Sequence, residues 1–330
     1  MRPDTVRTLI VTALVSLVLA GPTAVPSYAT TAVPSFAATA AGHHAGHHAH
    51  HHKPSKHGHK KHGHKKHGKS RLSLTIGTYN LRAGMGMRKF RNGVTSLRRH
   101  VGIAGLQEIG SNRRRHYLTS LRGWGYFRPR YIQQNPVIWN RSRFRLVKAH
   151  GDRIARSRHL RGQLPGAKRR KKDSTATVVR LRDRASGRRI SVINVHLVHG
   201  AVKGGKPWPH RPAVFNLFRN QVAGLVDAVK RERRWGRVFV TGDFNVGYRA
   251  DKHYALPRLP YRRLSRIKLN SMWQGTRYLR HDRGTHSDAL IDQIWSKRKP
   301  ARARILRWVR PSDHFPAIAT YRIRRAHHRH

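Results

Sequence analysis

The sequence predicts one α/β domain across residues 71–325, and three observations lead to that prediction. Short apolar segments recur along this region, several with the alternation of half-buried strands. One longer segment, 212–234, instead places apolar residues three and four positions apart, as an amphipathic helix does. No internal repeat is visible. Strands interleaved with helices over about 255 residues indicate a sheet packed on a second sheet or on helices.

The elements follow in order along the chain. An alternating strand at 72–79 ends at Asn80, and a more buried strand at 101–106 runs into Glu108. The helix has Pro212 near its start and Gly236 beyond its end, both typical of helix termini. Further strands are predicted at 136–139, 176–181, 190–195, 238–241, 289–295 and 317–323.

Residues 1–40 resemble a secretory signal peptide followed by a short pro-like segment. Arg2 and Arg7 precede an apolar stretch at 9–20, and small residues suitable for cleavage end at Ala29 and Ala37. A membrane anchor is the alternative, but this stretch is short for a bilayer. We therefore expect a secreted protein with no transmembrane segment in its mature form. The absence of cysteine means that its fold relies on its core and not on disulfides.

Residues 41–70 form a His/Lys/Gly-rich tract with almost no apolar side chains, and 326–330 form a His/Arg tail. Such a tract cannot bury a core, so we expect a disordered linker. Histidine also binds transition metals and gains charge near pH 6.5. The tract therefore has two further interpretations, transition-metal binding and adhesion to an anionic cell surface.

The formal charge of +57 belongs mainly to the predicted domain, because 61 of the 70 Lys and Arg residues but only 12 acidic residues lie in 71–330. A field of this sign attracts polyanions, in a salt-dependent manner. The partners that it favours are nucleic acid, DNA first, and anionic lipid surfaces.

Acidic residues are scarce, yet several occur directly at the ends of predicted strands. Glu108 follows the strand at 101–106, and Asp243 and Asn245 follow the strand at 238–241. The carboxylate of Glu108 is a suitable ligand for Mg²⁺. Asp243 and Asn245, a carboxylate and an amide on one side of the chain, could position a phosphate and the water that attacks it. An isolated acid at a strand end is more often an ordinary surface residue, so these positions gain weight only together.

Histidines occupy similar positions. His196 ends the strand at 190–195, and Asp313 and His314 lie in a polar break before the last strand. Asp292 has apolar neighbours on both sides and should be buried. A buried carboxylate needs a partner, and an imidazole is a natural one.

In chain order, six segments together resemble the endonuclease/exonuclease/phosphatase superfamily, which includes deoxyribonuclease I, exonuclease III-type repair nucleases, neutral sphingomyelinases and inositol polyphosphate 5-phosphatases. The resemblance covers 72 to about 323. It implies a four-layer α-β-β-α sandwich with two packed mixed β-sheets, deoxyribonuclease I-like, and a metal-dependent phosphoesterase site along one edge. The segments are Thr-Tyr-Asn80-Leu, Leu-Gln-Glu108, Asn-Val-His196-Leu, Gly-Asp243-Phe-Asn245, Ile-Asp292-Gln-Ile and Ser-Asp313-His314-Phe-Pro.

The resemblance also implies roles for single residues. Glu108 is similar to the principal Mg²⁺ ligand of the family, with Asn80 beside it, and Mn²⁺ or Ca²⁺ are alternatives to Mg²⁺. His314 matches the general base, oriented by Asp292. Asp313 would assist in positioning the metal or the phosphate.

Four further positions match residues that hold the substrate. Asp243 and Asn245 would hold the nucleophile and the scissile phosphate, and His196 would donate to phosphate oxygens. Tyr131 lies near the position of a phosphate-binding tyrosine, although Tyr126 is also close.

Two departures refine the resemblance. Arg82 stands where the repair nucleases carry an acid, as in the deoxyribonuclease I-like branch, which favours a phosphate contact over a second metal ligand. Gln133 and Gln134 occupy the region where that branch pairs its first histidine with a glutamate, so the partner of His196 is open.

These features predict a secreted, metal-dependent, non-specific DNA endonuclease, which we expect to be a monomer. One alternative within the superfamily is a secreted sphingomyelinase-like phospholipid phosphodiesterase, for which 206–210, with Trp208, is a candidate membrane-entry hairpin. An alternative of another class is a non-catalytic cationic protein that binds DNA or surfaces.

Overall fold

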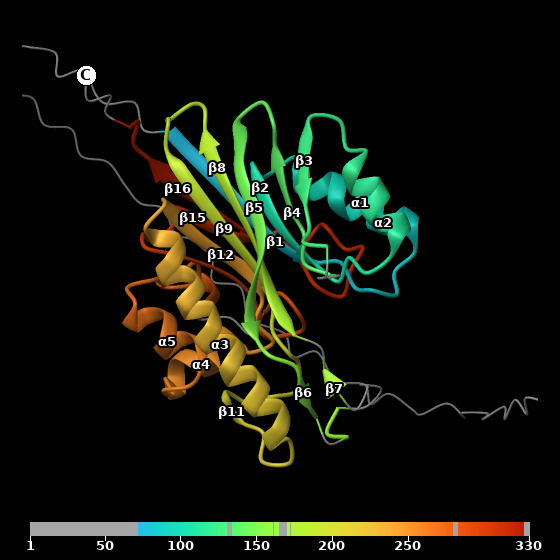
Figure 1. Cartoon of the computed structure of the whole chain (residues 1–330), viewed down its shortest axis with the longest axis vertical. Helices are drawn as coiled ribbons and strands as arrows, with labels where there is room; N and C mark the ends of the chain where they lie inside the picture. Colours follow the sequence, from blue (N-terminus) through green and yellow to red (C-terminus); the bar gives the residue numbers. More distant parts are fainter. Residues whose placement is uncertain are drawn as a thin grey trace, which may run out of the picture. The chain divides into compact units, whose positions relative to one another are not determined.

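Two six-stranded β-sheets lie at the centre of the protein (Figure 1). The computed structural model describes residues 72–130, 134–160, 162–164, 170–171, 173–279 and 283–326, all within one compact unit. The segments for which we predict a signal peptide, a linker and a basic tail lie outside the described residues, except Ala326. Secretion and the role of the His-rich tract therefore remain predictions.

The first sheet has the order β15-β16-β1-β2-β4-β3, and the second has the order β13-β14-β12-β9-β8-β5. Both are mixed, since β1 is parallel to β2 and β12 is parallel to β9, while other neighbours are antiparallel. The strand bounds in the first sheet are Arg302–Ile305, Ala317–Ile323, Leu72–Asn80, Ile103–Gln107, Val137–Asn140 and Trp124–Phe127, in sheet order. Those in the second are Asn270–Ser271, Asp292–Ser296, Arg237–Asp243, Arg189–His196, Ser174–Asp183 and Phe144–Ala155.

Helices cover the outer faces of the sheets, as Figure 1 shows. Helices α1 (Met87–Arg98) and α2 (Asn112–Thr119) lie beside the first sheet, and α3 (Pro212–Arg233), α4 (Tyr248–Tyr254) and α5 (Pro260–Arg266) lie beside the second. The predicted four-layer α-β-β-α sandwich is therefore confirmed. Two short hairpins, β6–β7 (Arg158–His159, Arg170–Lys171) and β10–β11 (Val202–Lys203, Lys206–Pro207), complete the described strands. Among the described residues, no helix is long and apolar enough to cross a membrane.

The apolar periodicity of the sequence explains the layers. In β1, Leu74 and Ile76 point into the core between the sheets, whereas Tyr79 belongs to the cluster under α1. Helix α3 begins at Pro212, as predicted, and buries Val214 and Phe218 against the second sheet. Both patterns follow from side chains that alternate along a strand and repeat every three to four residues along a helix.

A buried polar network connects the two sheets. The Asn194 side chain donates to the backbone carbonyl of Leu106 at 2.8 Å and accepts from Gln107 at 2.7 Å and from Thr241 at 3.1 Å. Only glycine fits at position 105 beside it, because a Cβ there would lie 2.2 Å from the Thr241 hydroxyl. Buried polar groups that are fully paired fix one arrangement of a core, and this network therefore fixes the relative position of the two sheets.

The strand predicted at 289–295 begins only at Asp292. Ala289 instead closes a tight turn with His286, and the carbonyls of Leu290 and Ile291 accept from Tyr248 and Phe244 of the neighbouring loop. These backbone groups are paired outside the sheet, so the strand cannot start earlier. As a result, Asp292 is the first strand residue, directly opposite Asp243.

Candidate active site

The strand registers bring the predicted site residues to one edge of the sandwich. Asn80, His196 and Asp243 are the last residues of β1, β9 and β12, and Glu108 directly follows β2. Within the second sheet, Asp243 pairs in register with His196 on one side and with Asp292 on the other. Polar residues that are distant in sequence therefore share the carboxyl ends of parallel strands, where α/β folds bind ligands.

Asp292 and His314 form a buried pair at this edge. The Nδ1 atom of His314 lies 2.8 Å from Oδ2 of Asp292, and Asp292 is fully buried. The backbone N–H of Asp292 donates to the Thr285 hydroxyl at 3.1 Å, which fixes the start of β14. The pairing of Asp292 with a histidine agrees with the prediction from its apolar flanks. Because Nδ1 of His314 is engaged by Asp292, Nε2 is the ring nitrogen that can exchange a proton with a substrate.

The surroundings of His314 favour its protonated form. Burial by itself lowers the pKa of His314, but the carboxylates of Asp292, Asp243 and Asp313 raise it, with a net value of about 9. Burial also raises the pKa of Asp292. A positive charge beside Asp243 would offset this negative field and return the His314 pKa toward neutrality, which a general base requires.

Asp243 lies between two imidazoles. Its Oδ2 atom is 3.5 Å from Nε2 of His196 and 3.9 Å from Nε2 of His314. Its Oδ1 atom accepts from the backbone N–H of Asn245 at 2.9 Å. The carboxylate is almost fully buried. It is thus placed to orient a small molecule held between the two rings.

Asn80 connects Asp243 with Glu108. Its Nδ2 donates to Oδ2 of Asp243 at 3.0 Å and to Oε1 of Glu108 at 2.9 Å, while its Oδ1 accepts from the backbone N–H of Arg82 at 3.1 Å. The Glu108 Oε2 atom accepts from the Ala83 N–H at 2.6 Å. One buried amide therefore holds two carboxylates side by side, with one contributed by each sheet.

Several of these residues have a backbone that non-glycine residues rarely adopt. Positive φ angles occur at Arg82 (25°), Glu108 (64°) and Asn245 (51°). In Asn245 the side-chain amide also donates to the carbonyl of Leu197 at 2.9 Å. Such conformations cost energy and concentrate at functional sites, where the surrounding structure holds them in place.

Arg82 and Asp313 lie at the exposed rim. The Arg82 Nε atom is 3.7 Å from Oδ2 of Asp313. Both line a pocket of about 450 Å³ together with Arg88 and Lys89. This pocket offers three cationic side chains beside the buried residues of the edge, which suits phosphate groups that extend beyond the reacting one.

Comparison with solved structures identifies the fold. An endonuclease/exonuclease/phosphatase family protein from Bacteroides thetaiotaomicron is 18% identical, with a TM-score of 0.57 over 76% of this chain and 98% of the other. The fold is that of the endonuclease/exonuclease/phosphatase proteins. A mannosyl-6-phosphatase from the same organism is 16% identical, with a TM-score of 0.57 over 76% and 99% of the two chains. TDP2 from D. rerio, complexed with a single strand DNA product, is 14% identical, with a TM-score of 0.53 over 75% and 98%.

No family model matches the sequence, and no curated protein matches it either. At these identities the similarity concerns the fold, and the fold serves several chemistries. The activity of this chain must therefore be argued from its own residues.

The edge of this endonuclease/exonuclease/phosphatase fold also contains residues that the sequence did not single out. The ring of His286 contacts that of His314, with centroids 4.5 Å apart and planes tilted by 44°, and the two residues form a β-bridge. Asn135, with its amide oriented to satisfy its neighbours, accepts from the backbone N–H of His196 at 3.3 Å. Neither residue stands in a periodic segment, and the only sequence signal was a histidine near a Gly-Thr turn.

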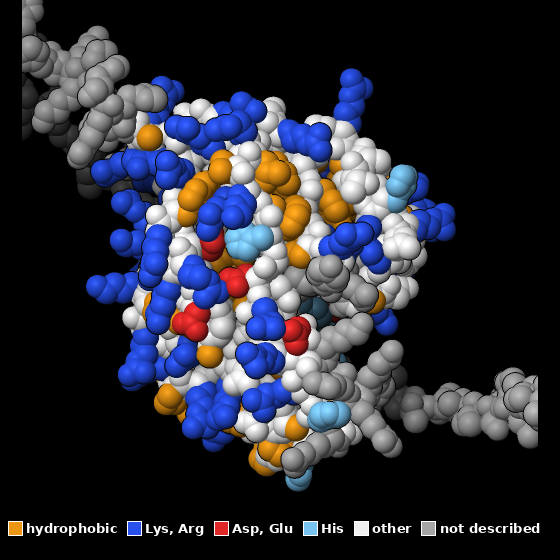
Figure 2. Space-filling view, in the orientation of Figure 1, with side chains coloured by type: hydrophobic (Ala, Val, Ile, Leu, Met, Phe, Trp, Pro, Cys, Tyr) orange, Lys and Arg blue, Asp and Glu red, His pale blue; other side chains and the backbone are white. Residues whose placement is uncertain are grey.

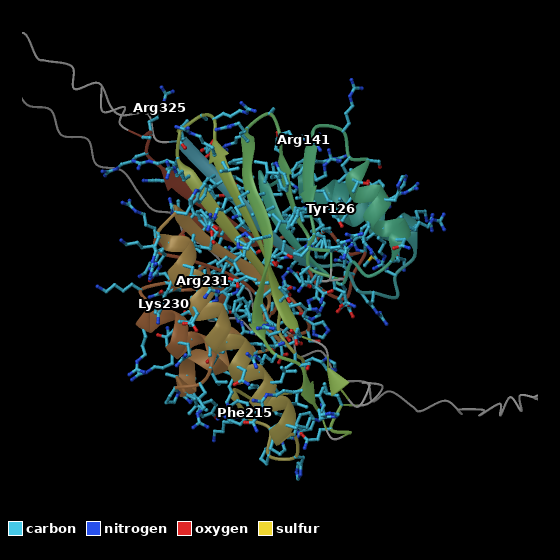
Figure 3. The ribbon with its side chains drawn as sticks, viewed as in Figure 1. Tyr126, Arg141, Phe215, Lys230, Arg231 and Arg325 are labelled. Atoms are coloured by element: carbon cyan, nitrogen blue, oxygen red, sulfur yellow. The ribbon has the colours of Figure 1, made fainter. Side chains whose placement is uncertain are left out.

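The prediction of a phosphate-binding tyrosine concerns Tyr131, with Tyr126 close to it in the sequence. Tyr131 and Gln133 lie outside the described residues. Tyr126 is on β3 and half-buried (Figure 3), and Gln134 is exposed. The sequence left the partner of His196 open. Among the described residues, the carboxylate beside His196 is that of Asp243, whose Oδ2 atom lies 3.5 Å from Nε2.

The carboxylates of this edge fit a divalent cation. Within the described residues, Glu108, Asp243 and Asp292 form no ion pair with any Lys or Arg, although the chain has 70 of them. Asp243, Asp292 and His314 offer ligand atoms within 4.8 Å of one another. Oδ2 of Asp292 and Nδ1 of His314 are hydrogen-bonded to each other. A cation would also have access to the adjoining carboxylates of Glu108 and Asp243, which Asn80 holds side by side. Such hard oxygens suit Mg²⁺, Mn²⁺ or Ca²⁺.

Proposed function

We propose that this chain is an exported, divalent-metal-dependent phosphodiesterase that hydrolyses nucleic acid, with DNA as its first substrate. One observation carries the proposal: the buried Asp292–His314 pair faces Asp243, and among the described residues neither of these two buried carboxylates forms an ion pair with Lys or Arg. A positioned base beside a cation site is what hydrolysis of a phosphodiester requires.

The residues of the edge divide the reaction among them. A bound divalent cation, held by Glu108 and Asp243, would supply Lewis acidity at a phosphoryl oxygen. His314 takes a proton from the attacking water through Nε2, because Asp292 occupies Nδ1. His196 donates from Nε2 to a phosphate oxygen on the other side of Asp243.

Nucleic acid is favoured over a small phosphate ester by the charge around this edge. Arg82, Arg88 and Lys89 line the adjoining pocket, and basic side chains are spread across the face shown in Figure 2. Contacts to successive backbone phosphates supply most of the affinity of non-specific nucleic-acid binding. The DNA product in the similarly folded TDP2 supports the same substrate class.

A lipid substrate has weaker support. In the β10–β11 hairpin region, Trp208 is half-buried, and its ring lies 3.9 Å from the Arg211 guanidinium and 5.5 Å from Lys203 Nζ. Two cations cover this aromatic ring, whereas membrane entry requires an exposed apolar tip. The observation disfavours the sphingomyelinase-like alternative.

The test uses the purified full chain with plasmid DNA, an RNA oligonucleotide and sphingomyelin vesicles, each with Mg²⁺ or with chelator. We expect cleavage of DNA that requires the metal, and a loss of about 100-fold or more in His314→Ala. His253→Ala, which removes an exposed histidine on α4, is the matched control and should keep full activity. Cleavage of sphingomyelin but not of nucleic acid would replace the substrate, and full activity of His314→Ala would refute the mechanism.

A further inference from the structure

A second cationic pocket lies at the opposite end of the sheets. It has a volume of about 540 Å³ and is lined by residues at the start of β9, the start of β12 and the end of β16. Strands β9 and β12 are parallel and connect the two ends of the sheets. Arg237 pairs with Ile190 at the pocket, and Asp243 pairs with His196 at the opposite end, the edge that carries the candidate active site (the catalytic edge). Seven residues of β12 separate the two ends, which corresponds to about 20 Å.

We call this cavity the distal arginine pocket. Its lining contains six arginines and no acidic residue, with Ile190, Trp235 and Ile323 among the apolar side chains between them. The arginines are Arg188, Arg189, Arg237, Arg298, Arg322 and Arg324. Within the described residues, none of the six forms an ion pair with a carboxylate. An adjoining pocket of about 340 Å³ shares Arg237 and Arg298 and adds three more basic side chains, Arg233, Lys268 and Lys297.

Two of the six arginines build the walls. Arg188 donates to the carbonyls of Arg324 and Arg325, both at 3.2 Å, and Arg237 donates to the carbonyl of Arg322 at 3.3 Å. These bonds attach residues 322–325, at and just beyond the end of β16, to the second sheet. Figure 3 places Arg325 beside the pocket side of the sandwich. The walls of the pocket are therefore held in place by hydrogen bonds within the protein.

Arg237 lies at the floor without a counter-charge. Its guanidinium packs over the rings of Phe239 and Tyr321, at 4.9 and 5.4 Å, and its Nε and Nη2 atoms are shielded from water with no hydrogen-bond partner. Burial lowers the pKa of Arg237, and the neighbouring Arg298 lowers it further. A cation in this position is costly unless an opposite charge is near.

The other four arginines have guanidinium groups available for a ligand. Arg189, Arg298, Arg322 and Arg324 are exposed, and no described residue bonds to their side chains. Gly236, which also lines the cavity, lets two backbone segments approach closely, since a Cβ there would lie 2.7 Å from the Arg189 carbonyl oxygen. Guanidinium groups that surround a cavity in this way match phosphate oxygens, which accept two parallel N–H bonds.

We propose that the distal arginine pocket is a second anion site, which binds phosphate groups independently of the catalytic edge. The ligand is either a free oligophosphate or the backbone of a nucleic-acid strand, both of which present the same chemistry. A bound phosphate would supply the counter-charge that Arg237 lacks. Phosphate binding in this pocket does not require the proposed phosphodiesterase activity.

The test measures equilibrium binding of inorganic tripolyphosphate to the full chain by calorimetry, at low salt and with chelator present. The pocket variant is Arg298→Gln with Arg322→Gln, two exposed residues without partners. The control, Arg141→Gln with Arg258→Gln, removes the same charge from exposed positions outside the pockets (Figure 3 labels Arg141). We expect affinity to fall at least about tenfold in the pocket variant and less than about threefold in the control.

Equal losses in the two variants would overturn the proposal, because only the overall field would then matter. Absence of binding to the wild type would overturn it as well. A second measurement distinguishes a free oligophosphate from a nucleic-acid strand as the ligand. It compares the binding of a single-stranded oligonucleotide to both variants, each also carrying His314→Ala. Loss of strand binding specific to the pocket variant supports nucleic acid, and unchanged strand binding with weakened tripolyphosphate binding supports a free oligophosphate.

Discussion

The buried carboxyl group of Asp251 should give the protein a pH-dependent stability. Asp251 lies on α4 and is fully buried; its Oδ2 atom accepts from the backbone N–H of Tyr261 at 2.8 Å, whereas Oδ1 has no partner. Burial raises its pKa to about 7, from an ordinary value of 3.8. Helix α4 directly follows the loop that carries Asn245.

The sign follows from proton linkage. Between about pH 4 and 7 the folded protein keeps a proton on Asp251 that the unfolded chain releases, so the free energy of unfolding falls as the pH rises. A shift of about three pKa units corresponds to about 4 kcal/mol over this window. Above the folded pKa the curve levels off.

Urea denaturation from pH 4 to 8 should show this loss in the wild type and not in Asp251→Asn. Asp227→Asn is the control, because Asp227 is exposed on α3 and forms only a surface pair with Lys230. Parallel curves for the wild type and Asp251→Asn, or a wild type that gains stability relative to that variant as pH rises, would refute the reasoning.

Three further predictions concern the site and its support. Asp292→Asn replaces the carboxylate that orients the His314 ring with a neutral amide. We therefore expect kcat on a chromogenic phosphodiester to fall about 100-fold or more, with KM little changed; an unchanged kcat would contradict the role. Asn80→Ala removes the amide that holds the Glu108 and Asp243 carboxylates side by side. Half-maximal activation should then need about tenfold more Mg²⁺, and an unaltered metal titration would contradict this role of Asn80. Gly105→Ala places a Cβ 2.2 Å from Thr241 between the sheets and should lower stability by about 1–3 kcal/mol in thermal unfolding.

Part of this edge could be predicted from the sequence because several of its residues end strands with a clear apolar pattern. Asn80 and His196 are examples, as they are the last residues of β1 and β9. The side chains of such strands report burial directly. Once the strands are located, the order of a sheet brings their carboxyl ends together.

Other elements gave no comparable pattern. Strand β5, Phe144–Ala155, lies at a sheet edge, has two register shifts and exposes most of its charged residues, so neither face alternates. His286 reaches His314 through a tight turn, and turns have no period to detect. The distal arginine pocket draws its residues from four separate segments, none of which is unusual alone in so basic a chain.

The distribution of ion pairs argues that the catalytic edge is specialised. Elsewhere in the described chain, two of the three buried acids pair with arginine, Asp183 with Arg143 and Glu232 with Arg180. The third, Asp251, forms no ion pair with any described residue, and burial raises its pKa to about 7. At the edge, the ionic partners of Asp243 and Asp292 among the described residues are all histidines. With so many cationic side chains in the chain, a guanidinium beside Asp243 would have neutralised this buried carboxylate. Its exclusion leaves the carboxylates for a cation and the surrounding arginines for phosphate, and this separation is what a metal-dependent phosphodiesterase needs.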